Sequence, residues 1–491
     1  MITIKPLNLL KIKKKLLKPF IRYYILITFF LLIHQIAFCV KLPAIFTDNL
    51  VLQQQTKVAI WGWSDPGKKI TVIPSWDKNK YTSVTDTSGK WKLKISTPVA
   101  GGPYEIIISD GKSKKINNVL IGEVWLCSGQ SNMEFPMKGF LGQPVIGSNE
   151  AILKSKNSNI RFISIPRASS TEPLKDFEDN WKEAEPKTVS EFSATAYYFG
   201  RLLNELLDVP IGLIDVSYGG SCIQAWMSKE TSPPFEDKNI PTKGDSIKVK
   251  NRTPTVLFNG MLSPVIGYGI NGCIWYQGET NYKEPEKYPE MLKTMVEEWR
   301  SLWGVGKFSF YYAQIAPFSY KQFKPEVYIE KYNSAYLREA QLKAMDLIPN
   351  CGMAVLMDVG EKDCIHPANK KVAGERLAFW ALAKTYGIEG FGYESPTYKA
   401  IEIKDSVIIV SFNNVPNGLT SFGKELESFE IAGEDKIFYP AKTVLRRKSV
   451  VVSCSKVKEP KAVRYAFKDF IVGDLFSTEG LPVSSFRTDD W

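Results

Sequence analysis

Between residues 41 and 118, apolar positions recur in short, strand-like segments. These segments are rich in β-branched and aromatic residues and read "TKVAIWGW", "KKITVIP", "KWKLKIST" and "YEIIIS". Turn signals separate them, among them Asp65-Pro66-Gly67 and Asp110-Gly111. Short strands at this spacing are typical of antiparallel β structure. We therefore predict an N-terminal β domain over residues 40–118.

From about residue 119, apolar runs alternate with segments of helical periodicity. The runs "NVLIGEVWLC", "IGLIDVSYGG", "NGCIWYQGE", "FSFYYAQIAPF" and "CGMAVLMDVG" are predicted strands, and amphipathic stretches such as "SATAYYFGRLLNELLD" and "EMLKTMVEEWRSLWG" are predicted helices. Such alternation indicates a parallel sheet covered by helices on both faces. We therefore predict an α/β domain over residues 119–390.

After about residue 390 the segments are again β-like, as in "AIEIKDSVIIVSF", "SVVVSC" and "AVRYAF". A C-terminal β region over residues 391–491 is predicted. The pattern leaves open whether this region stands alone or completes the N-terminal β domain.

The first 39 residues have the order of a secretory signal. Residues 1–22 carry seven basic residues and no acid, and the apolar block "YYILITFFLLIHQIAF" follows at 23–38. This block is short for a membrane span, which needs about 20 apolar residues. We expect export to the periplasm or the extracellular space with removal of residues 1–39, without a stable membrane span afterwards. An uncleaved membrane anchor is the alternative. Lipid attachment at Cys39 is a weaker hypothesis, because Phe38 stands where a small residue is wanted.

Charge and cysteine content exclude several classes of protein. The net charge of +11 falls to +4 once the seven basic residues of the signal are removed. No concentrated basic stripe remains, so a nucleic acid partner is not expected. The seven cysteines form no CxxC pair, which argues against a zinc site of that type. Their disulfide pairing and the oligomeric state stay open.

Four polar clusters follow predicted strands: Ser128–Ser131, Tyr218–Ser221, Gln277–Asn281 and Asp363–His366. Ligands of doubly wound sheets bind at the carboxyl ends of the strands. We therefore expect these clusters to meet in one site.

Histidine narrows the chemistry of that site. The chain contains two histidines, and His34 lies in the predicted signal, so His366 is the single histidine expected in the mature protein. A metal site built on several histidines is excluded, but a general base needs only one. Asp363 precedes His366 by three residues, a spacing that can bring a carboxylate to Nδ1–H and fix the tautomer. With an ordinary pKa near 6.5, this base would lose activity below that pH.

The nucleophile of a hydrolase at this site would come from "WLCSGQSNMEF". Ser131 follows a glycine at the end of a predicted strand and begins a predicted helix. Ser128 lies closer to the strand and is its competitor, whereas Cys127 fits a buried position. Each serine could equally be a simple helix cap or turn residue.

Candidate oxyanion donors follow the next two strands. Gly219 and Gly220 allow the backbone to approach a ligand closely, and Gln277 and Asn281 offer amide N–H groups. Ordinary turn roles remain alternatives for all four residues.

The motifs that carry these residues resemble the sialate O-acetylesterase family of SGNH (GDSL-like) hydrolases. They are "GQSNM" at 129–133, "YGGSCIQAWM" at 218–227, "WYQGETN" at 275–281 and "DCIHPANK" at 363–370. "LPAIFTDNLVLQQ" at 42–54, "LREAQ" at 337–341 and "EGLPVSSFRTDDW" at 479–491 extend the resemblance over nearly the whole mature chain.

The resemblance implies a flavodoxin-like α/β/α esterase domain that needs no metal or other cofactor. It makes Ser131 the nucleophile, His366 the base and Asp363 its orienting carboxylate. The oxyanion hole would comprise the N–H of Ser131, a glycine N–H from Gly219 or Gly220, and an amide.

The third motif departs from the superfamily pattern, because Thr280 stands where an Asn is usual. Gln277 is therefore our first choice for the amide donor and Asn281 the second. Gln130, Trp226 and Glu279 are the predicted substrate-binding residues, although tryptophans in such strands are more often part of the core.

The implied activity is removal of O-acetyl groups from a carbohydrate partner, with sialate as the first substrate. A xylan or pectin acetylesterase and a glycan-binding protein without catalysis are the alternatives.

Overall fold

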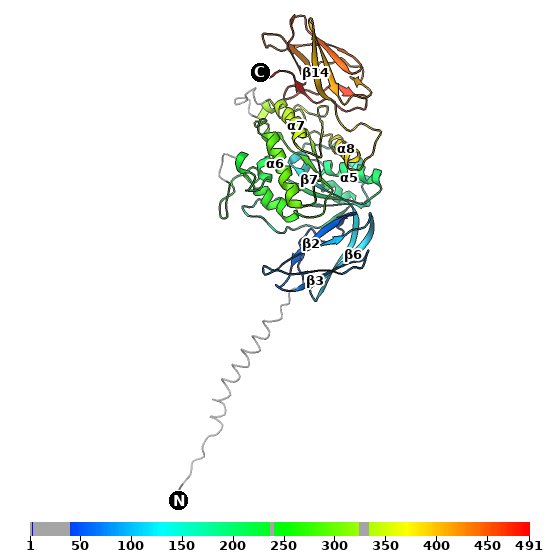
Figure 1. Ribbon diagram of the computed structural model, residues 1–491, viewed down its shortest axis with the longest axis vertical. Coiled ribbons are helices and arrows are strands. Elements are labelled where there is room, and N and C mark those ends of the chain that lie inside the picture. The colour runs from blue at the N-terminus through cyan, green and yellow to red at the C-terminus, as the bar shows by residue number, and fades with distance from the viewer. Residues whose placement is uncertain (1, 3–39, 236–239, 324–332) are drawn as a thin grey trace.

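The computed structural model describes residue 2 and residues 40–235, 240–323 and 333–491 (Figure 1). The predicted signal, with Cys39, thus lies outside the described residues except for residue 2. Within the described ranges, no helix has the length and apolarity needed to cross a bilayer.

One strand of 17 residues, β7 (Ser113–Gly129), forms the centre of the molecule (Figure 1). Its C-terminal half pairs in parallel with β10 (Ile211–Ser217) on one side and β11 (Gly272–Tyr276) on the other. The sheet continues beyond β11 through β12 (Ser309–Ala313) and β13 (Cys351–Ala354). Beyond β10 it continues through β8 (Asn157–Ser164) and the antiparallel β9 (Lys182–Ala184).

The strand order confirms the predicted flavodoxin-like fold. Apart from β8 and β9, which we did not predict, the strands lie in the order β10-β7-β11-β12-β13. The first strand in the chain thus lies between the second and the third, and the topological switch point falls at β7. A ligand is expected at its carboxyl end, where "SGQSN" lies.

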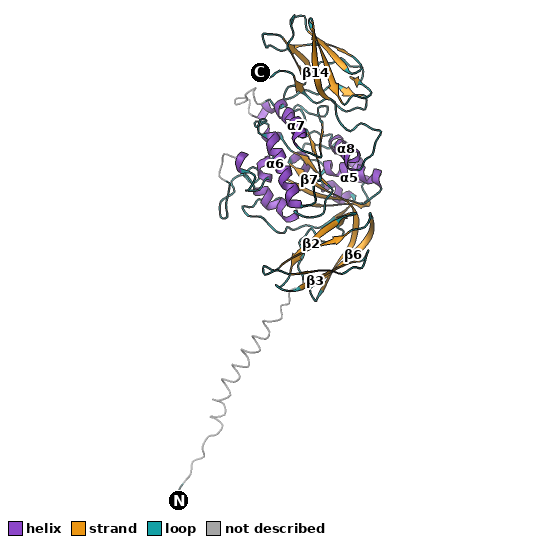
Figure 2. Cartoon of the chain, in the orientation of Figure 1, coloured by secondary structure: helices purple, strands orange, loops and turns teal. Residues whose placement is uncertain are grey.

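Helices cover both faces of the sheet (Figure 2). On one face lie α5 (Ala194–Leu207) and α8 (Lys370–Trp380), and on the other α6 (Tyr288–Trp303) and α7 (Ala335–Leu347). Along β7, Trp125 and Cys127 belong to the core under α5 and α8, whereas Val124 and Leu126 belong to the core under α6 and α7. Both sets are fully buried because successive side chains of a strand point to opposite faces.

Local signals explain where the helices begin and end. Gly304 ends α6 in the left-handed conformation, with φ +63°, and the side chain of Asn369 caps the start of α8 by accepting from Val372 N–H. The predicted helix after Pro367 therefore begins three residues later than that proline. The other α-helices among the described residues are short: α2 (Ser131–Glu134), α3 (Ser148–Leu153) and α4 (Pro186–Glu191).

The N-terminal β structure is continuous with the central sheet. The first half of β7 pairs in antiparallel fashion with β6 (Gly101–Ser109), and β1 (Val51–Gln53) joins β7 in parallel. The remaining strands are β3 (Lys69–Pro74) and β4 (Tyr81–Val84), which extend from β6, and the pair β2 (Lys57–Trp63) and β5 (Lys90–Ser96). Because β7 runs through residues 118 and 119, one strand serves both predicted domains. The predicted boundary stays a prediction about folding units.

The C-terminal β structure lies at the opposite end of the molecule from the N-terminal β structure, so the two do not join (Figure 1). One four-stranded sheet consists of β14 (Thr397–Lys404), β15 (Val407–Asn413), β20 (Ser449–Ser453) and β19 (Lys442–Leu445). A second consists of β18 (Tyr439–Pro440), β17 (Phe429–Ala432), β21 (Ala462–Tyr465) and β23 (Phe486–Arg487), and β16 (Leu419–Thr420) pairs with β22 (Phe476–Ser477).

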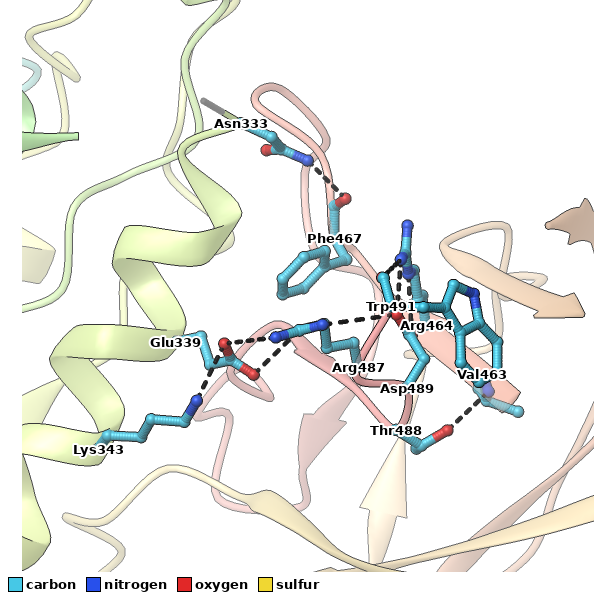
Figure 3. Close-up of polar contacts among 10 residues, drawn as sticks. All are labelled: Asn333, Glu339, Lys343, Val463, Arg464, Phe467, Arg487, Thr488, Asp489 and Trp491. Atoms are coloured by element: carbon cyan, nitrogen blue, oxygen red, sulfur yellow. Dashed lines mark hydrogen bonds and ion pairs between the residues drawn. The ribbon is translucent and has the colours of Figure 1, made fainter. Parts of the chain in front are cut away.

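Charged contacts fasten this C-terminal structure to α7 (Figure 3). Arg487 forms an ion pair with Glu339 of α7 at 3.3 Å, and Arg464 binds both oxygens of Asp489 at 3.0 and 2.6 Å. The Arg487–Glu339 ion pair thus connects this β structure to a helix that covers the central sheet, whereas the Arg464–Asp489 pair lies within the β structure.

Candidate active site

Ser131 lies where the chain turns from β7 into α2, and its side chain is half-buried. Gly129, the last residue of β7, has φ +141°, and a Cβ there would overlap the carbonyl oxygen of Tyr276 in β11. Glycine is required because β7 stays paired with β11 to this position. As the first residue of α2, Ser131 has no acceptor for its N–H inside the helix.

The structure brings Ser131 and His366 together. Ser131 Oγ lies 2.7 Å from His366 Nε2, although the two residues are 235 positions apart in the chain. The imidazole packs against the rings of Phe135 and Phe140, with centroid distances of 5.4 and 6.3 Å. A serine hydroxyl at this distance can donate its hydrogen bond to the ring nitrogen, as general-base catalysis requires.

The other ring nitrogen of His366 meets an amide. Gln143 Oε1 lies 2.6 Å from His366 Nδ1. Because an amide oxygen only accepts, Nδ1 carries the proton and Nε2 presents its lone pair to the Ser131 hydroxyl. Gln143 therefore fixes the tautomer that a base at Nε2 needs.

Asp363 does not occupy the place predicted for it. The spacing of "DCIH" predicted a carboxylate at His366 Nδ1, but Gln143 takes that position and the Asp363 side chain is exposed. The loop before α8 turns this carboxylate towards solvent, so the predicted contact is absent in this structure.

Burial and a neighbouring charge set the pKa of His366. Burial disfavours the imidazolium most, and the positive charge of Lys370 disfavours it further, so the pKa of His366 falls from 6.5 to about 4. The imidazole is therefore neutral, and able to accept a proton, at pH values well below the ordinary histidine range.

The side chains of the two competing nucleophiles, Ser128 and Cys127, are buried. Ser128 is fully buried, and its hydroxyl donates to Val216 O at 2.6 Å. Cys127 is also fully buried, and burial raises the pKa of its thiol well above the ordinary value. Neither group can reach a substrate at the end of β7.

The turn formed by Gly219 and Gly220, here called the glycine turn, lies beside Ser131. A Cβ on Gly219 would lie 3.4 Å from Ser131 Cβ. Gly219 N–H, however, donates to Glu134 Oε2 at 2.7 Å. Gly220 has φ +67°, and its N–H has no acceptor among the described residues. Of the two predicted glycine donors, Gly220 is thus the one whose N–H is available.

The side-chain amides of the two predicted donors, Gln277 and Asn281, already form hydrogen bonds within the core. Gln277 is fully buried, and its Nε2 donates to Ser221 O at 3.1 Å and to Asn281 Oδ1 at 2.7 Å. Asn281 is 1% exposed, and its Nδ2 donates to Gln224 and Glu284. Either amide would have to exchange these bonds to serve an oxyanion.

The three predicted substrate-binding residues are also buried. Trp226 is fully buried and donates from Nε1 to Ser221 Oγ at 2.9 Å. Gln130 is 3% exposed, and its Oε1 accepts from Gly278 N–H at 3.3 Å. Glu279 is 4% exposed and accepts from Asn132. In this arrangement they support the loops of the site, and no face of theirs is open to a sugar.

Sequence reasoning missed Gln143, Asn132 and Lys370. Asn132 and Lys370 stand inside the recognised motifs "GQSNM" and "HPANK", so their position next to Ser131 and His366 was a usable signal. Gln143 lies in a stretch without periodicity, and no signal in the sequence could have found it.

Two arginines lie near the glycine turn, and they differ in whether an acidic side chain among the described residues pairs with them. Arg167 pairs with Glu134, at 2.6 Å between Nη2 and Oε2, and stacks on Tyr218. Arg252 is exposed, donates from Nε to Gly220 O at 3.1 Å, and forms no ion pair among the described residues. Among the described residues, the positive charge of Arg252 thus has no opposite charge paired with it beside Gly220.

Comparison with known proteins gives the site a family context. A family model described as "Carbohydrate esterase, sialic acid-specific acetylesterase" matches residues 121–379. The sialate O-acetylesterase of Homo sapiens is 28% identical over 403 residues, with 74% of this chain and 74% of that protein covered. The Mus musculus sialate O-acetylesterase is 28% identical over 421 residues, with 73% and 76% covered.

Among solved structures, a carbohydrate acetylesterase from Xanthomonas citri has a TM-score of 0.83 and 33% sequence identity. The alignment covers 92% of this chain and 100% of that one. The similarity therefore extends over both β regions as well as the central sheet.

Proposed function

This chain belongs to the carbohydrate esterase family of sialic acid-specific acetylesterases, and from that premise we propose that it removes O-acetyl groups from acidic sugars, sialate first, through an acetyl-Ser131 intermediate. It is a carboxylic ester hydrolase whose substrate class is an acetylated carbohydrate. The observation that carries the proposed mechanism is the 2.7 Å contact between Ser131 Oγ and His366 Nε2.

Acylation begins with the Ser131 hydroxyl. Its oxygen attacks the acetyl carbonyl carbon while His366 Nε2 takes the proton. The tetrahedral intermediate collapses as the bond to the sugar oxygen breaks, and His366 returns the proton to that oxygen. The sugar leaves with a free hydroxyl, and the acetyl group remains on Ser131.

Deacylation repeats these steps with water. His366 takes a proton from water, the hydroxide oxygen attacks the acetyl carbon, and the Ser131 oxygen leaves with the proton from His366. Acetate is the second product. The N–H groups of Ser131 and Gly220 are our first candidates for the oxyanion hole, because neither has an acceptor among the described residues.

Gln143 supports this mechanism as the group that orients His366, since its oxygen accepts from Nδ1–H. Asp363 remains the family-based hypothesis for that role. Separate variants of Gln143 and Asp363 distinguish the two assignments.

Arg252 favours an acidic sugar over a neutral one. A guanidinium without an ion-pair partner binds a carboxylate through charge-assisted hydrogen bonds. Arg252 has no such partner among the described residues, and it donates to the carbonyl of Gly220, which follows the Gly219 that lies beside Ser131. Sialic acid carries such a carboxylate, and so do the uronates of pectin, whereas an unsubstituted xylan backbone carries none.

The test is acetate release from a panel of acetylated sialosides, pectin and xylan. We expect turnover by the wild-type protein, highest on the sialosides, and background rates for Ser131→Ala. Mass spectrometry of a quenched reaction should show one acetyl group on Ser131. Equal rates for wild type and Ser131→Ala would favour the non-catalytic alternative.

Export and domain organisation are further parts of the proposal. We propose that residues 1–39 direct export and are removed, and that the β regions before residue 119 and after residue 390 flank the esterase domain. N-terminal sequencing of the protein from its native host tests the first point: an intact Met1 would contradict it, and a lipid-modified Cys39 would support anchoring.

A further inference from the structure

A chain of three buried polar side chains lies next to the Ser131–His366 pair. Its members are Glu279 in the turn after β11, Asn132 in α2 and Lys370 at the start of α8. They are 4%, 1% and 1% exposed. The mechanism above uses none of them, although two carry ionisable groups.

Asn132 connects the loops that carry the nucleophile and the base. It follows Ser131 directly, and its Nδ2 donates to Glu279 Oε1 at 2.5 Å and to Ile365 O at 3.2 Å. Ile365 is the residue before His366. One amide therefore fixes the backbone on both sides of the Ser131–His366 contact.

Lys370 is the third member of this group of buried side chains and binds the oxygen end of the Asn132 amide. Its Nζ donates to Asn132 Oδ1, which orients the amide so that Nδ2 faces Ile365 O. The ammonium also lies 4.5 Å from the centroid of the Phe135 ring, and the same ring packs against His366. Lys370 thus contacts Asn132, which bonds the carbonyl of the residue before His366, and Phe135, whose ring packs against the imidazole.

Glu279 provides the opposite charge that the buried ammonium of Lys370 requires. A lone buried ammonium is strongly unfavourable, whereas one with an opposite charge nearby is tolerated. Glu279 raises the pKa of Lys370, but burial is the larger effect and lowers it to about 7. Burial in turn raises the pKa of Glu279, and Lys370 counteracts this.

We propose that Lys370, acting through Asn132 and balanced by Glu279, is a positioning residue that holds His366 against Ser131 and whose positive charge opposes protonation of the imidazole. The proposal rests on Ser131 and His366 being the catalytic pair. It assigns Lys370 no contact with the substrate.

The sign of the electrostatic effect follows from the groups that face each side chain. Around the imidazole ring of His366 these are Ser131, Gln143, Phe135 and Phe140, all uncharged. The Cys364 thiol donates to the backbone carbonyl of His366, and Lys370 supplies the charge that acts on the ring. Around Lys370 the ionisable groups are Glu279, Cys364 and Glu361. Removing the Lys370 charge therefore raises the pKa of His366, but only in part, since burial of the imidazole remains.

The experiment measures the His366 pKa directly, by NMR of the full-length protein labelled with [13C]histidine. A His34→Gln background leaves His366 as the single imidazole, because the chain has two histidines. In Lys370→Met we expect the pKa to rise from about 4 by about one unit. Lys371→Met is the matched control, because Lys371 is the next residue, is exposed and pairs with Glu375 on the surface. It should leave the pKa unchanged.

The kinetic readout uses the same variants. In Lys370→Met the acid limb of kcat/KM should move to higher pH by the same amount as the NMR pKa. At pH 7, kcat should fall about tenfold, the effect of a loosened hydrogen-bond link between the two loops, while KM stays within about twofold because the substrate is not contacted.

Lys370→Met leaves the buried Glu279 carboxylate without its opposite charge and can impair folding for that reason alone. The double variant Glu279→Gln/Lys370→Met removes both charges and serves as the second test. It should fold and show the same direction of change in both readouts. An unchanged His366 pKa in either folded variant would overturn the proposal. Because the NMR titration needs no turnover, this outcome is distinct from a failure of the esterase assignment, which Ser131→Ala tests.

Discussion

The side-chain oxygen of Gln143 lies 2.6 Å from Nδ1 of His366, in the position where a Ser-His-Asp hydrolase carries its carboxylate. A neutral amide fixes the imidazole tautomer as a carboxylate does, but it adds no negative charge to stabilise the imidazolium. An amide in place of a carboxylate at Nδ1 is consistent with a His366 pKa of about 4, because burial lowers the pKa and no anion at Nδ1 raises it.

Replacing Gln143 should therefore impair catalysis more than replacing Asp363. Gln143→Ala removes a hydrogen bond to an imidazole that becomes charged during the reaction, a loss of about 1.5–3 kcal/mol, or about 10- to 150-fold in kcat. Asp363→Asn is the matched control and should remain within about twofold of wild type, since an exposed side chain without the predicted contact contributes little. Steady-state rates of acetate release decide, and the reverse ranking would restore Asp363 as the orienting residue.

The pH profile should report the depressed pKa of His366. Protonation inactivates the base, so kcat/KM should be flat above about pH 5.5 and fall through about pH 4. The sequence alone suggested a fall near 6.5. Gln143→Glu places a carboxylate at Nδ1, which favours the imidazolium, and should move the acid limb to higher pH. An acid limb near 6.5 in the wild type would show that the imidazole is not desolvated as the structure has it.

The same shift links pH to stability. The folded pKa of His366 lies below its unfolded value, so between about pH 6.5 and pH 4 the unfolded chain binds more protons at this residue. The contribution of neutral His366 to the free energy of unfolding is therefore complete above about pH 6.5 and is lost as the pH falls towards 4. Denaturant titrations of wild type and His366→Gln over this range measure it as a difference in slope with pH.

Gly129 should tolerate no side chain. Gly129→Ala adds a Cβ that overlaps Tyr276 O as well as the cost of positive φ, together about 4 kcal/mol or more in the free energy of unfolding, and should abolish activity. Gly111→Ala is the matched control, since Gly111 has φ +120° with no atom within 4 Å of a Cβ. It should cost about 1–3 kcal/mol, the backbone contribution alone. Similar losses for both variants would mean that β7 and β11 separate at this point without penalty.

Arg252 should select acidic substrates. Arg252→Ala should raise KM for an acetylated sialoside about tenfold, the loss of a charge-assisted hydrogen bond, and leave KM for acetylated xylan unchanged. Lys248→Ala is the control, because Lys248 is an exposed cation in the same segment. Equal changes for both substrates would show that Arg252 supports the Gly220 turn and does not bind a carboxylate.

The sequence by itself determined the fold class and the neighbourhood of the site. Alternating apolar runs and amphipathic segments required a parallel sheet with helices on both faces, since only that arrangement buries them. Polar clusters after "NVLIGEVWLC" and "IGLIDVSYGG" then had to meet at one sheet edge. The single histidine outside the predicted signal restricted the candidate bases to His366, which the structure brings to 2.7 Å from Ser131.

The tertiary structure decided which side chains complete the site. Gln143, not Asp363, reaches Nδ1 of His366, because side-chain direction in an irregular loop depends on packing that no periodicity encodes. Gln277 and Asn281 have the right chemistry for an oxyanion hole, but their amides are bonded within the core. Sequence spacing brings chemical groups to the same edge of a sheet, whereas the distribution of hydrogen bonds among them depends on contacts between residues far apart in the chain.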